Sequence, residues 1–394
     1  MPWKNTSFEN QRSEFIAAYL RRKSSLCELC RHWSISRKTA YKWIARFMAK
    51  GRADLHDRPR CCVRVSNRPT QLWLERIRRW RRAHPSWGAA KLHWTLKRRF
   101  GPKNLPSRAA IGRWLKAWRL TGKPARIRHR GTPAQRPKPS PARRPNDVWT
   151  VDFKGWFRTG DRTRVEPLTI RDLASRMILA AELLGKPTIE QSRPVFEKLF
   201  RSHGLPRVIR SDNGAPFGAS GALGLTRLSA WWLKLGIQVE FIEPGRPDQN
   251  GAHEQVHRVY KAETLQPPAR TLRAQKQRTR RWIKTYNHER PHEALGMRVP
   301  AEMYRKSARK MPRENKPWKY PKSWQSRLVK GKGMISLEGQ GRYIGEAFER
   351  ERIGLKRTKR GHWKVYFGPH KLGVLSSEES TGIRAKWYRR KKRR

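Results

Sequence analysis

The sequence predicts a multidomain α/β protein. Tandem helix-turn-helix domains come first, followed by a mixed-sheet catalytic core and a small C-terminal β-barrel. The first 120 or so residues carry apolar side chains at helical spacing, without a strand pattern. From residue 147 strand patterns alternate with helical ones, which favours a mixed sheet covered by helices. Beyond residue 332 short β-rich runs are separated by glycine turns, as in small barrels.

The charge of the chain indicates a polyanionic partner. Its 394 residues include 92 Lys and Arg against 30 Asp and Glu, a formal net charge of +62. Because the excess is spread over every segment, nucleic acid is the expected partner. A membrane is not expected, since no apolar run reaches the roughly 18 residues needed to span a bilayer. The first residues also lack the apolar core of a signal peptide, so we expect a cytoplasmic protein.

Residues 1–64 are predicted to be a helix-turn-helix domain with three short helices between residues 8 and 47. Ser36 is a good N-cap for the last helix. That helix has a buried stripe made of Ala40, Trp43, Ile44 and Phe47. Its outer face, which would enter the major groove of DNA, carries Lys38, Tyr41, Lys42 and Arg46. A solvated basic face on an ordinary three-helix bundle is the alternative.

Residues 65–122 are predicted to be a second helix-turn-helix-like domain. Helices at about 70–83 and 89–99 precede Ser107, which is the N-cap of a third helix. The third helix buries Ile111, Trp114, Leu115 and Trp118. Its open side offers DNA-binding candidates, namely Arg108, Arg113 and Lys116. Two tandem modules can read a longer DNA site than one.

The four cysteines do not form a disulfide framework in a chain of this length. Cys27 and Cys30 have the C-x-x-C spacing of zinc ligands, but Cys61 and Cys62 are adjacent and do not. We expect Cys27 and Cys30 to be small half-buried residues on a helix, with zinc as the alternative.

Basic segments join and follow these domains. Residues 123–146 are a Pro-rich linker, which either tracks phosphates or acts as a self-repelling spacer. Residues 305–332 are a basic connector before five short strands at 333–380. The tail, 381–394, is expected to be disordered until it meets an anion.

The catalytic core is predicted at residues 147–304. Strands are expected at 148–157, 164–172, 176–184, 206–211 and 237–242. Helices are expected at about 188–203, 224–235 and 250–290. A glycine-rich loop at 213–224 lies beside the fourth strand.

Three acidic residues of the core form the candidate catalytic and metal-binding site. Asp152 lies in the apolar alternation of the first strand, and Asp212 follows a strand and precedes an Asn-Gly turn. Glu254 starts a helical pattern, and Arg258 and Lys261 share its face at i+4 and i+7. Three such carboxylates suit a phosphoryl-transfer site that holds two divalent cations. Arg258 and Lys261 would bind the phosphates of a DNA end beside it. Each acid alone is an ordinary cap, turn or surface residue, so only the joint pattern is specific.

Four blocks around these acids, at 149–153, 211–214, 244–254 and 286–292, resemble the integrase-type core of bacterial insertion-sequence transposases. Retroviral integrases are more distant relatives with the same ribonuclease H-like fold. Segments 35–47 and 84–92 are similar to helix-turn-helix regions of these transposases.

The resemblance places the acidic triad of the family on Asp152, Asp212 and Glu254. It implies two Mg²⁺ or Mn²⁺ ions, binding to the terminal inverted repeats of a mobile element, hydrolytic nicking of its ends, and attack of the freed 3′-hydroxyl on target DNA. It also implies a homo-oligomer working on double-stranded DNA in the bacterial nucleoid.

Two departures from the family pattern concern the third acid. The spacing after Asp212 is longer than usual, and the usual spacing would select Asp248. We retain Glu254 because it keeps the Asn-Gly-x-x-Glu context and because the glycine-rich loop can absorb the surplus. Gln255 stands where family members commonly carry Arg.

Two alternatives remain for the function. His253, Glu254 and His257 fit the H-E-x-x-H signature of zinc metalloproteases, for which Glu289 or Glu293 could supply a third ligand. That hypothesis leaves both aspartates and both DNA-reading modules unexplained. The other alternative is a DNA-binding regulator with an inactive integrase-like core, against which the complete triad argues.

Overall fold

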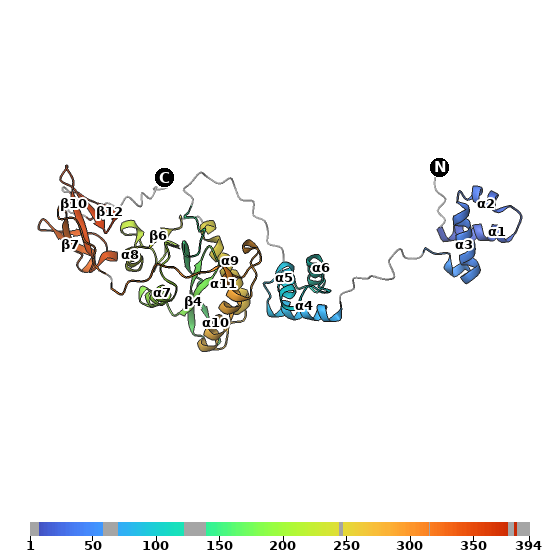
Figure 1. Cartoon of the computed structure of the whole chain (residues 1–394), viewed down its shortest axis with the longest axis horizontal. Coiled ribbons are helices and arrows are strands. Elements are labelled where there is room, and N and C mark those ends of the chain that lie inside the picture. Colours follow the sequence, from blue (N-terminus) through green and yellow to red (C-terminus); the bar gives the residue numbers. More distant parts are fainter. Residues whose placement is uncertain are drawn as a thin grey trace. The chain divides into compact units, whose positions relative to one another are not determined.

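The computed structural model describes residues 8–57, 70–121, 139–243, 247–314, 316–376 and 382–383. Residues 1–68 form one compact unit, and residues 69–394 form another (Figure 1). In the described segments no helix combines the length and the apolar character that a membrane span requires.

The first unit contains the three predicted helices, α1 (Phe8–Leu20), α2 (Leu26–His32) and α3 (Arg37–Lys50). Ser36 caps α3, since its hydroxyl accepts a hydrogen bond from the backbone N–H of Thr39. The predicted stripe of α3 packs into a small core, although Phe47 is only half-buried. On α2, Cys30 is buried and Cys27 half-buried, while Cys61 and Cys62 lie outside the described residues.

The second helical module has α4 (Gln71–Ala83), α5 (Ala89–Phe100) and α6 (Arg108–Ala117). Ser107 caps α6 by accepting from the N–H of Ala110. The helices enclose an aromatic-rich core made of Trp73, Ile77, Trp87, Leu92, Leu96, Ile111 and Leu115. The predicted helices are therefore confirmed in both modules.

A mixed sheet forms the centre of the core domain, as predicted. Its strands are β1 (Val148–Phe153), β2 (Phe157–Arg158), β3 (Arg164–Asp172), β4 (Ile178–Leu184), β5 (Val208–Ser211) and β6 (Gln238–Phe241). The strand β1 pairs antiparallel with β3 on one side and parallel with β5 on the other. The strands β4 and β6 extend the sheet beyond β3 and β5, and β2 pairs with the start of β3. The expected strand at 148–157 is thus divided into β1 and β2.

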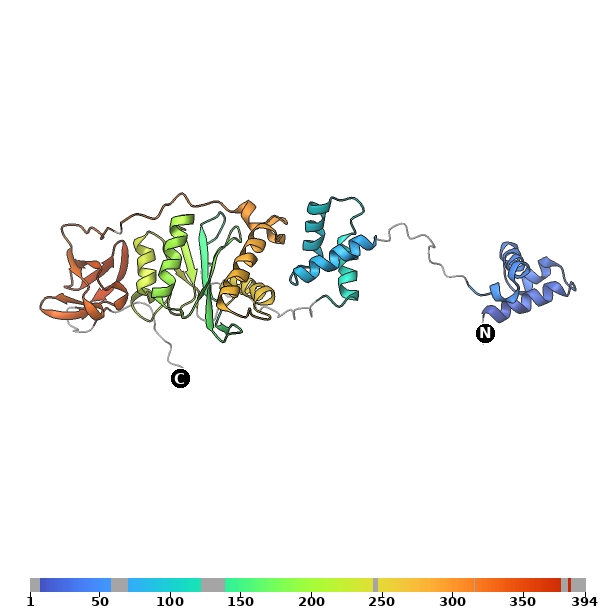
Figure 2. The same ribbon diagram turned by 90° about the horizontal axis from the view of Figure 1, so that it is seen from below.

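Helices cover both faces of this sheet (Figure 2). The helices α7 (Ile189–His203) and α8 (Arg227–Lys234) pack on one face through Phe196, Phe200 and Trp232. On the other face, α9 (Gly251–Thr264) and α10 (Leu272–His288) bury Tyr260 and Trp282 against β4. Short helices complete the chain: η1 (Gly51–Asp54), η2 (Ala222–Gly224), η3 (Pro247–Asn250), η4 (Glu293–Leu295), α11 (Pro300–Met303), η5 (Gly331–Gly333) and η6 (Glu346–Phe348).

The predicted linker and connector are partly built into the core. The end of the linker is fixed, because Ser140 bonds to Glu240 and Arg210, and the N–H of Asn146 donates to Asp172. In the connector, Arg309 donates to the carbonyl of Pro206. Both segments therefore form hydrogen bonds with the core domain. The sequence pattern did not predict these bonds.

The C-terminal strands do not close into the predicted barrel. The strands β12 (His370–Leu375), β11 (Trp363–Phe367), β10 (Arg352–Arg357) and β7 (Gln325–Leu328) form an open antiparallel sheet in that order. The strands β8 (Met334–Leu337) and β9 (Gln340–Tyr343) form a separate hairpin. A barrel needs its end strands to pair, and in the described residues β12 and β7 each have one neighbour. The strand β7 also lies within the segment expected to be a connector.

The C-terminal sheet shares a hydrophobic core with the core domain. Ala230 and Leu233 of α8 belong to the same buried cluster as Phe348, Ile353 and Val365. Beside this cluster, Lys234 Nζ lies 2.7 Å from Glu351 Oε1. The two domains are therefore joined by apolar packing as well as by the chain.

A buried ionic cluster connects the second helical module to the core domain. Arg290 Nη1 lies 3.3 Å from Glu263 Oε1 and donates to the Ser86 hydroxyl at 2.5 Å. The other carboxylate oxygen of Glu263 accepts from Trp282 Nε1 at 2.9 Å, and the Ser86 hydroxyl also bonds to Glu263. Ser86 lies between α4 and α5, so this cluster fixes the turn between those helices against α9 and α10.

Candidate active site

The parallel pairing of β1 with β5 brings the two predicted aspartates to one edge of the sheet. Val148 pairs with Val208, and each following residue pairs with the residue 60 positions later. Continuing this register to the ends of the strands places Asp152 beside Asp212. Asp212 is held in its turn by a hydrogen bond from the N–H of Gly214 to Oδ1 at 3.3 Å.

Asp212 and Glu254 both act electrostatically on the side chain of Asp152. Burial raises the pKa of Asp152 to about 7, and the negative charges of Asp212 and Glu254 contribute to the rise. A hydrogen bond from Asn250 to Asp152 Oδ2, at 3.0 Å, opposes it. Burial also raises the pKa of Asp212. Glu254 is exposed in the first turn of α9.

The donor set fits a hard divalent cation. In the described part of the chain no three His, Cys, Asp or Glu side chains are arranged as a finished metal-binding group. Nevertheless, Asp152 and Asp212 offer carboxylate oxygens at one edge of the sheet. Burial raises the pKa of both groups and so opposes their ionisation. Mg²⁺ and Mn²⁺ bind through such oxygens, and a cation between them would favour the ionised forms.

One basic side chain, Lys154, lies within electrostatic range of Asp152. Arg258 and Lys261 are exposed on α9, as the sequence predicted. Burial lowers the pKa of Lys154, and the nearby charge of Lys261 lowers it further. Sequence reasoning missed Lys154, although its place two residues after Asp152 in an alternating strand was a usable signal. It also assigned no role to Asn250.

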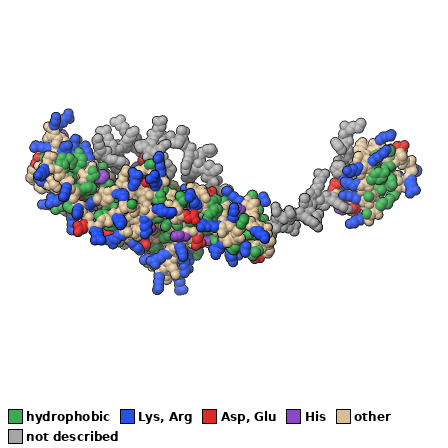
Figure 3. Space-filling model, viewed as in Figure 1, with side chains coloured by type: hydrophobic (Ala, Val, Ile, Leu, Met, Phe, Trp, Pro, Cys, Tyr) green, Lys and Arg blue, Asp and Glu red, His purple; other side chains and the backbone are tan. Residues whose placement is uncertain are grey.

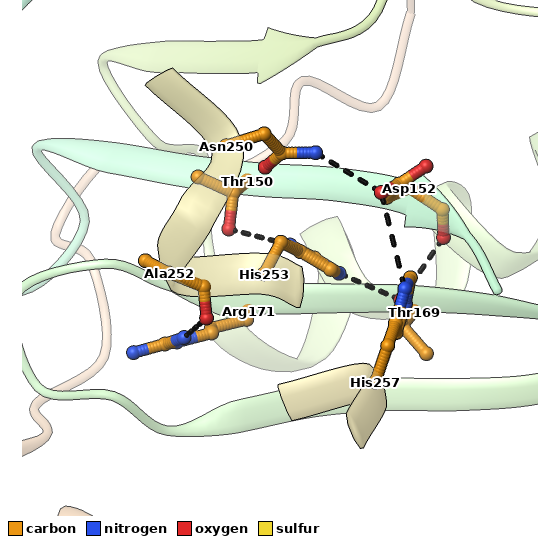
Figure 4. A network of polar contacts seen from close by, with 8 residues as sticks. All are labelled: Thr150, Asp152, Thr169, Arg171, Asn250, Ala252, His253 and His257. Carbon is orange, nitrogen blue, oxygen red and sulfur yellow. Dashed lines mark hydrogen bonds and ion pairs between the residues drawn. The ribbon is translucent and has the colours of Figure 1, made fainter. Parts of the chain in front are cut away.

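The two histidines of the H-E-x-x-H pattern point into the protein. His253 and His257 direct their Nε2 atoms at the hydroxyl of Thr169 on β3, at 2.6 and 2.7 Å (Figure 4). Burial lowers the pKa of both rings, that of His257 to about 3, so both are neutral. These nitrogens are therefore engaged with a hydroxyl group. The proposed third ligand Glu293 lies near Lys91, with its Oε1 3.4 Å from Nζ.

The competing third acid, Asp248, falls in η3, and its side chain lies outside the described residues. Glu254 therefore remains the choice on local sequence context.

The predicted DNA-reading faces are accessible. On α3, Lys38, Tyr41 and Lys42 are exposed and Arg46 is half-buried. On α6, Arg108, Arg113 and Lys116 are all exposed. Figure 3 shows Lys and Arg side chains across the described surface in that view, so the positive charge is not confined to these helices.

The raised pKa of Asp152 predicts a pH-dependent stability in metal-free protein. The neutral carboxyl is favoured in the fold, so its contribution is complete below the ordinary pKa of 3.8 and is lost progressively as the pH rises from there to about 7. We expect Asp152→Asn to be more stable than the wild type at pH 8 by on the order of 2 kcal/mol, with no such gap at pH 4. Thermal unfolding in EDTA at the two pH values measures this. Equal gaps at both pH values would contradict it.

Family models match most of the chain in separate pieces. Two models described as "Integrase core domain" match residues 142–247 and 235–300. A "Helix-turn-helix domain" matches residues 11–60, and a "Homeodomain-like domain" matches residues 39–115. The model "IS481 family transposase, C-terminal domain" matches residues 324–383.

Curated relatives come from insertion elements. The chain is 28% identical over 162 residues to the IS407 uncharacterized 31.7 kDa protein of Burkholderia multivorans, covering 40% of this chain and 55% of that protein. It is also 28% identical over 159 residues to the IS476 uncharacterized 39.2 kDa protein of Xanthomonas euvesicatoria, covering 40% of this chain and 44% of the relative. The chain thus spans about half the length of these relatives.

Similar solved structures include retroviral integrases. One is the HTLV-2 integrase catalytic core domain in complex with magnesium, with 15% identity and a TM-score of 0.30, covering 41% of this chain and 98% of that one. Another is the simian T-cell lymphotropic virus intasome, with 15% identity and a TM-score of 0.36, covering 73% of this chain and 91% of that one. The chain therefore matches models of the integrase core, of helix-turn-helix domains and of an IS481 family transposase C-terminal domain, and it is similar to proteins of two insertion elements.

Proposed function

We propose that the protein is a DNA transposase that binds the terminal inverted repeats of its mobile element, cleaves DNA strands there and transfers them to target DNA. The observation that carries the proposal is the placement of Asp152 and Asp212 at one edge of the sheet, within electrostatic range of Glu254. A site of clustered carboxylates in a chain of net charge +62 is suited to metal-dependent chemistry on a polyanion.

In this proposal Asp152, Asp212 and Glu254 hold two Mg²⁺ or Mn²⁺ ions. When bound, these ions supply activation of the attacking oxygen and stabilisation of charge on the leaving oxygen. The protein residues orient the DNA: Arg258 and Lys261, with Lys154 beside them, hold the phosphates of the DNA end. Asn250 orients the carboxylate of Asp152 through its amide.

The DNA-binding modules at 1–64 and 65–122 would select the element ends. Their exposed basic helices α3 and α6 have the composition that major-groove reading requires. We propose that two copies or more work together in the nucleoid, because two element ends must be held at once. The core at 147–304 then acts on both ends.

The metalloprotease alternative is disfavoured by the inward orientation of its imidazoles. Both Nε2 atoms of the pair are engaged by Thr169, and both rings are buried. The inactive-regulator alternative predicts DNA binding without strand cleavage, so the same assay tests it.

The proposed function is tested by incubating the full-length protein with labelled element-end DNA and Mg²⁺. We expect the wild type to nick the end, Glu254→Gln to be inactive and Asp248→Asn to remain active, because the proposal assigns the third acid to Glu254. Filter binding with the same DNA serves as the control for fold and affinity. Wild-type protein that binds but never cleaves would favour the regulator. If Glu254→Gln cleaves the DNA and Asp248→Asn does not, the third acid is Asp248 and not Glu254.

A further inference from the structure

A buried polar network lies beneath the candidate site and joins three elements (Figure 4). Its centre is the hydroxyl of Thr169 on β3, which lies 3.0 Å from the backbone carbonyl oxygen of Asp152 on β1. The same hydroxyl contacts the Nε2 atoms of His253 and His257 on α9. Thr169 and His253 are at most 2% exposed, and His257 is 9% exposed. One oxygen atom therefore connects the strand of the first acid with the helix of the third.

Counting hydrogens assigns the direction of every bond in this network. A hydroxyl has one hydrogen and two lone pairs, and a backbone carbonyl only accepts. All three contacts form together only if Thr169 donates to Asp152 and both imidazoles donate from Nε2. The Nδ1 atom of His253 then accepts from the Thr150 hydroxyl, 2.9 Å away. The Nδ1 atom of His257 lies 4.0 Å from Asp152 Oδ2.

This arrangement restricts the rotation of α9 about its axis. Two rings one helical turn apart converge on a single oxygen, so turning the helix would leave buried donors and acceptors unpaired. Arg171 of β3 adds a third anchor at the same end of α9, because its guanidinium donates to the carbonyl of Ala252. Apolar side chains at 253 and 257 would fill the same space without fixing this angle.

We propose that Thr169, His253 and His257 are positioning residues that hold Glu254 of α9 in register with Asp152 of β1. The inference rests on the proposed function, since it assigns these residues a part in building the same site. Glu254 follows His253 directly and faces solvent while His253 faces Thr169. The hydrogen bond between His253 and Thr169 therefore fixes the direction in which the side chain of Glu254 leaves α9.

The test compares Thr169→Val, which removes the hydroxyl at nearly constant volume, with Thr169→Ser, which keeps it. Thr264→Val is the matched control, because Thr264 is equally buried on α9 and its hydroxyl donates within the same helix, to the carbonyl of Tyr260. Mn²⁺ affinity is measured by calorimetry without DNA, and cleavage of element-end DNA is measured separately. We expect Thr169→Val to lose about tenfold to a hundredfold in both, as for other residues that orient metal ligands. Thr169→Ser and Thr264→Val should remain close to the wild type in Mn²⁺ affinity.

The results distinguish the positioning role from the proposed function. Mn²⁺ binding by the wild type, combined with unchanged affinity in Thr169→Val, would overturn the positioning role and leave the proposed function standing. An equal loss in Thr264→Val would also overturn it, because any buried hydroxyl would then suffice. Failure of the wild type both to bind Mn²⁺ and to cleave DNA would overturn the proposed function and the inference with it.

A measurement on the wild type guards against a variant that does not fold. Nitrogen-15 spectra of histidine-labelled protein, assigned with His253→Gln and His257→Gln, report which ring nitrogen carries the proton. We expect protonation at Nε2 in both rings. Protonation at Nδ1 of either ring would overturn the assignment of the network.

Discussion

Replacing Asp152 by Asn is expected to lower the rate of DNA end cleavage by about a thousandfold or more, because a metal site supplies several kcal/mol of transition-state stabilisation. Asp152 lies within the electrostatic influence of Asp212 and Glu254, and in the proposed site these three carboxylates would hold the cations. The amide keeps the shape of the side chain but loses the charge. Single-turnover cleavage of labelled end DNA measures the effect.

DNA affinity should change little in Asp152→Asn, because the proposed DNA contacts come from Lys and Arg side chains. The control variant is Glu190→Gln, which removes one exposed carboxylate from α7 on the opposite face of the sheet. Its cleavage rate should match the wild type. Residual activity of Asp152→Asn near the wild-type rate would remove Asp152 from the catalytic group.

Replacing Glu263 by Gln is expected to destabilise the protein by about 3 to 5 kcal/mol, the usual effect of removing one partner of a buried ion pair. Arg290 and Glu263 side chains are only 8% and 10% exposed. The neutral amide in the variant would leave the guanidinium of Arg290 without a countercharge. Because Ser86 shares the cluster, hydrogen exchange should increase first in the turn between α4 and α5.

The matched control for this variant is Glu197→Gln on the surface of α7. Glu197 pairs with Arg193 at 3.0 Å, but the two side chains are 29% and 49% exposed. Such pairs contribute about 0.3 to 0.5 kcal/mol, so this variant should unfold almost as the wild type does. Equal destabilisation by the two substitutions would show that burial of the Glu263 cluster is unimportant.

The helical modules could be predicted because their determinants are local. A serine N-cap followed by apolar residues at i, i+3, i+4 and i+7 defines each of the helices α3 and α6 within a dozen residues. The strand that carries Asp152 and the strand that precedes Asp212 were predicted for the same reason. Their juxtaposition was not derivable from pattern alone, since it depends on β1 pairing in parallel with β5.

Features set by distant partners were missed. The strand β7 has a polar sequence and is a strand only because β10 pairs with it, so Gln325–Leu328 resembled a connector. Closure of the expected barrel would have required β7 to pair with β12, which neighbouring residues do not encode. The pattern of His253 and His257 is the same whether they bind a metal or Thr169. The two possibilities differ only in whether β3 places the Thr169 hydroxyl against these imidazoles, as it does here.

The hydrophobic cluster shared by α8 and the C-terminal sheet bears on how such proteins exchange parts during evolution. A recombination event within residues 305–332 would separate Ala230 and Leu233 from the apolar partners selected with them. The hybrid would expose mismatched apolar surface and tend to aggregate. Residues 1–68 form their own compact unit with a separate core, so replacing them leaves that cluster intact. The N-terminal unit can therefore be exchanged without disturbing that cluster, whereas the C-terminal sheet cannot.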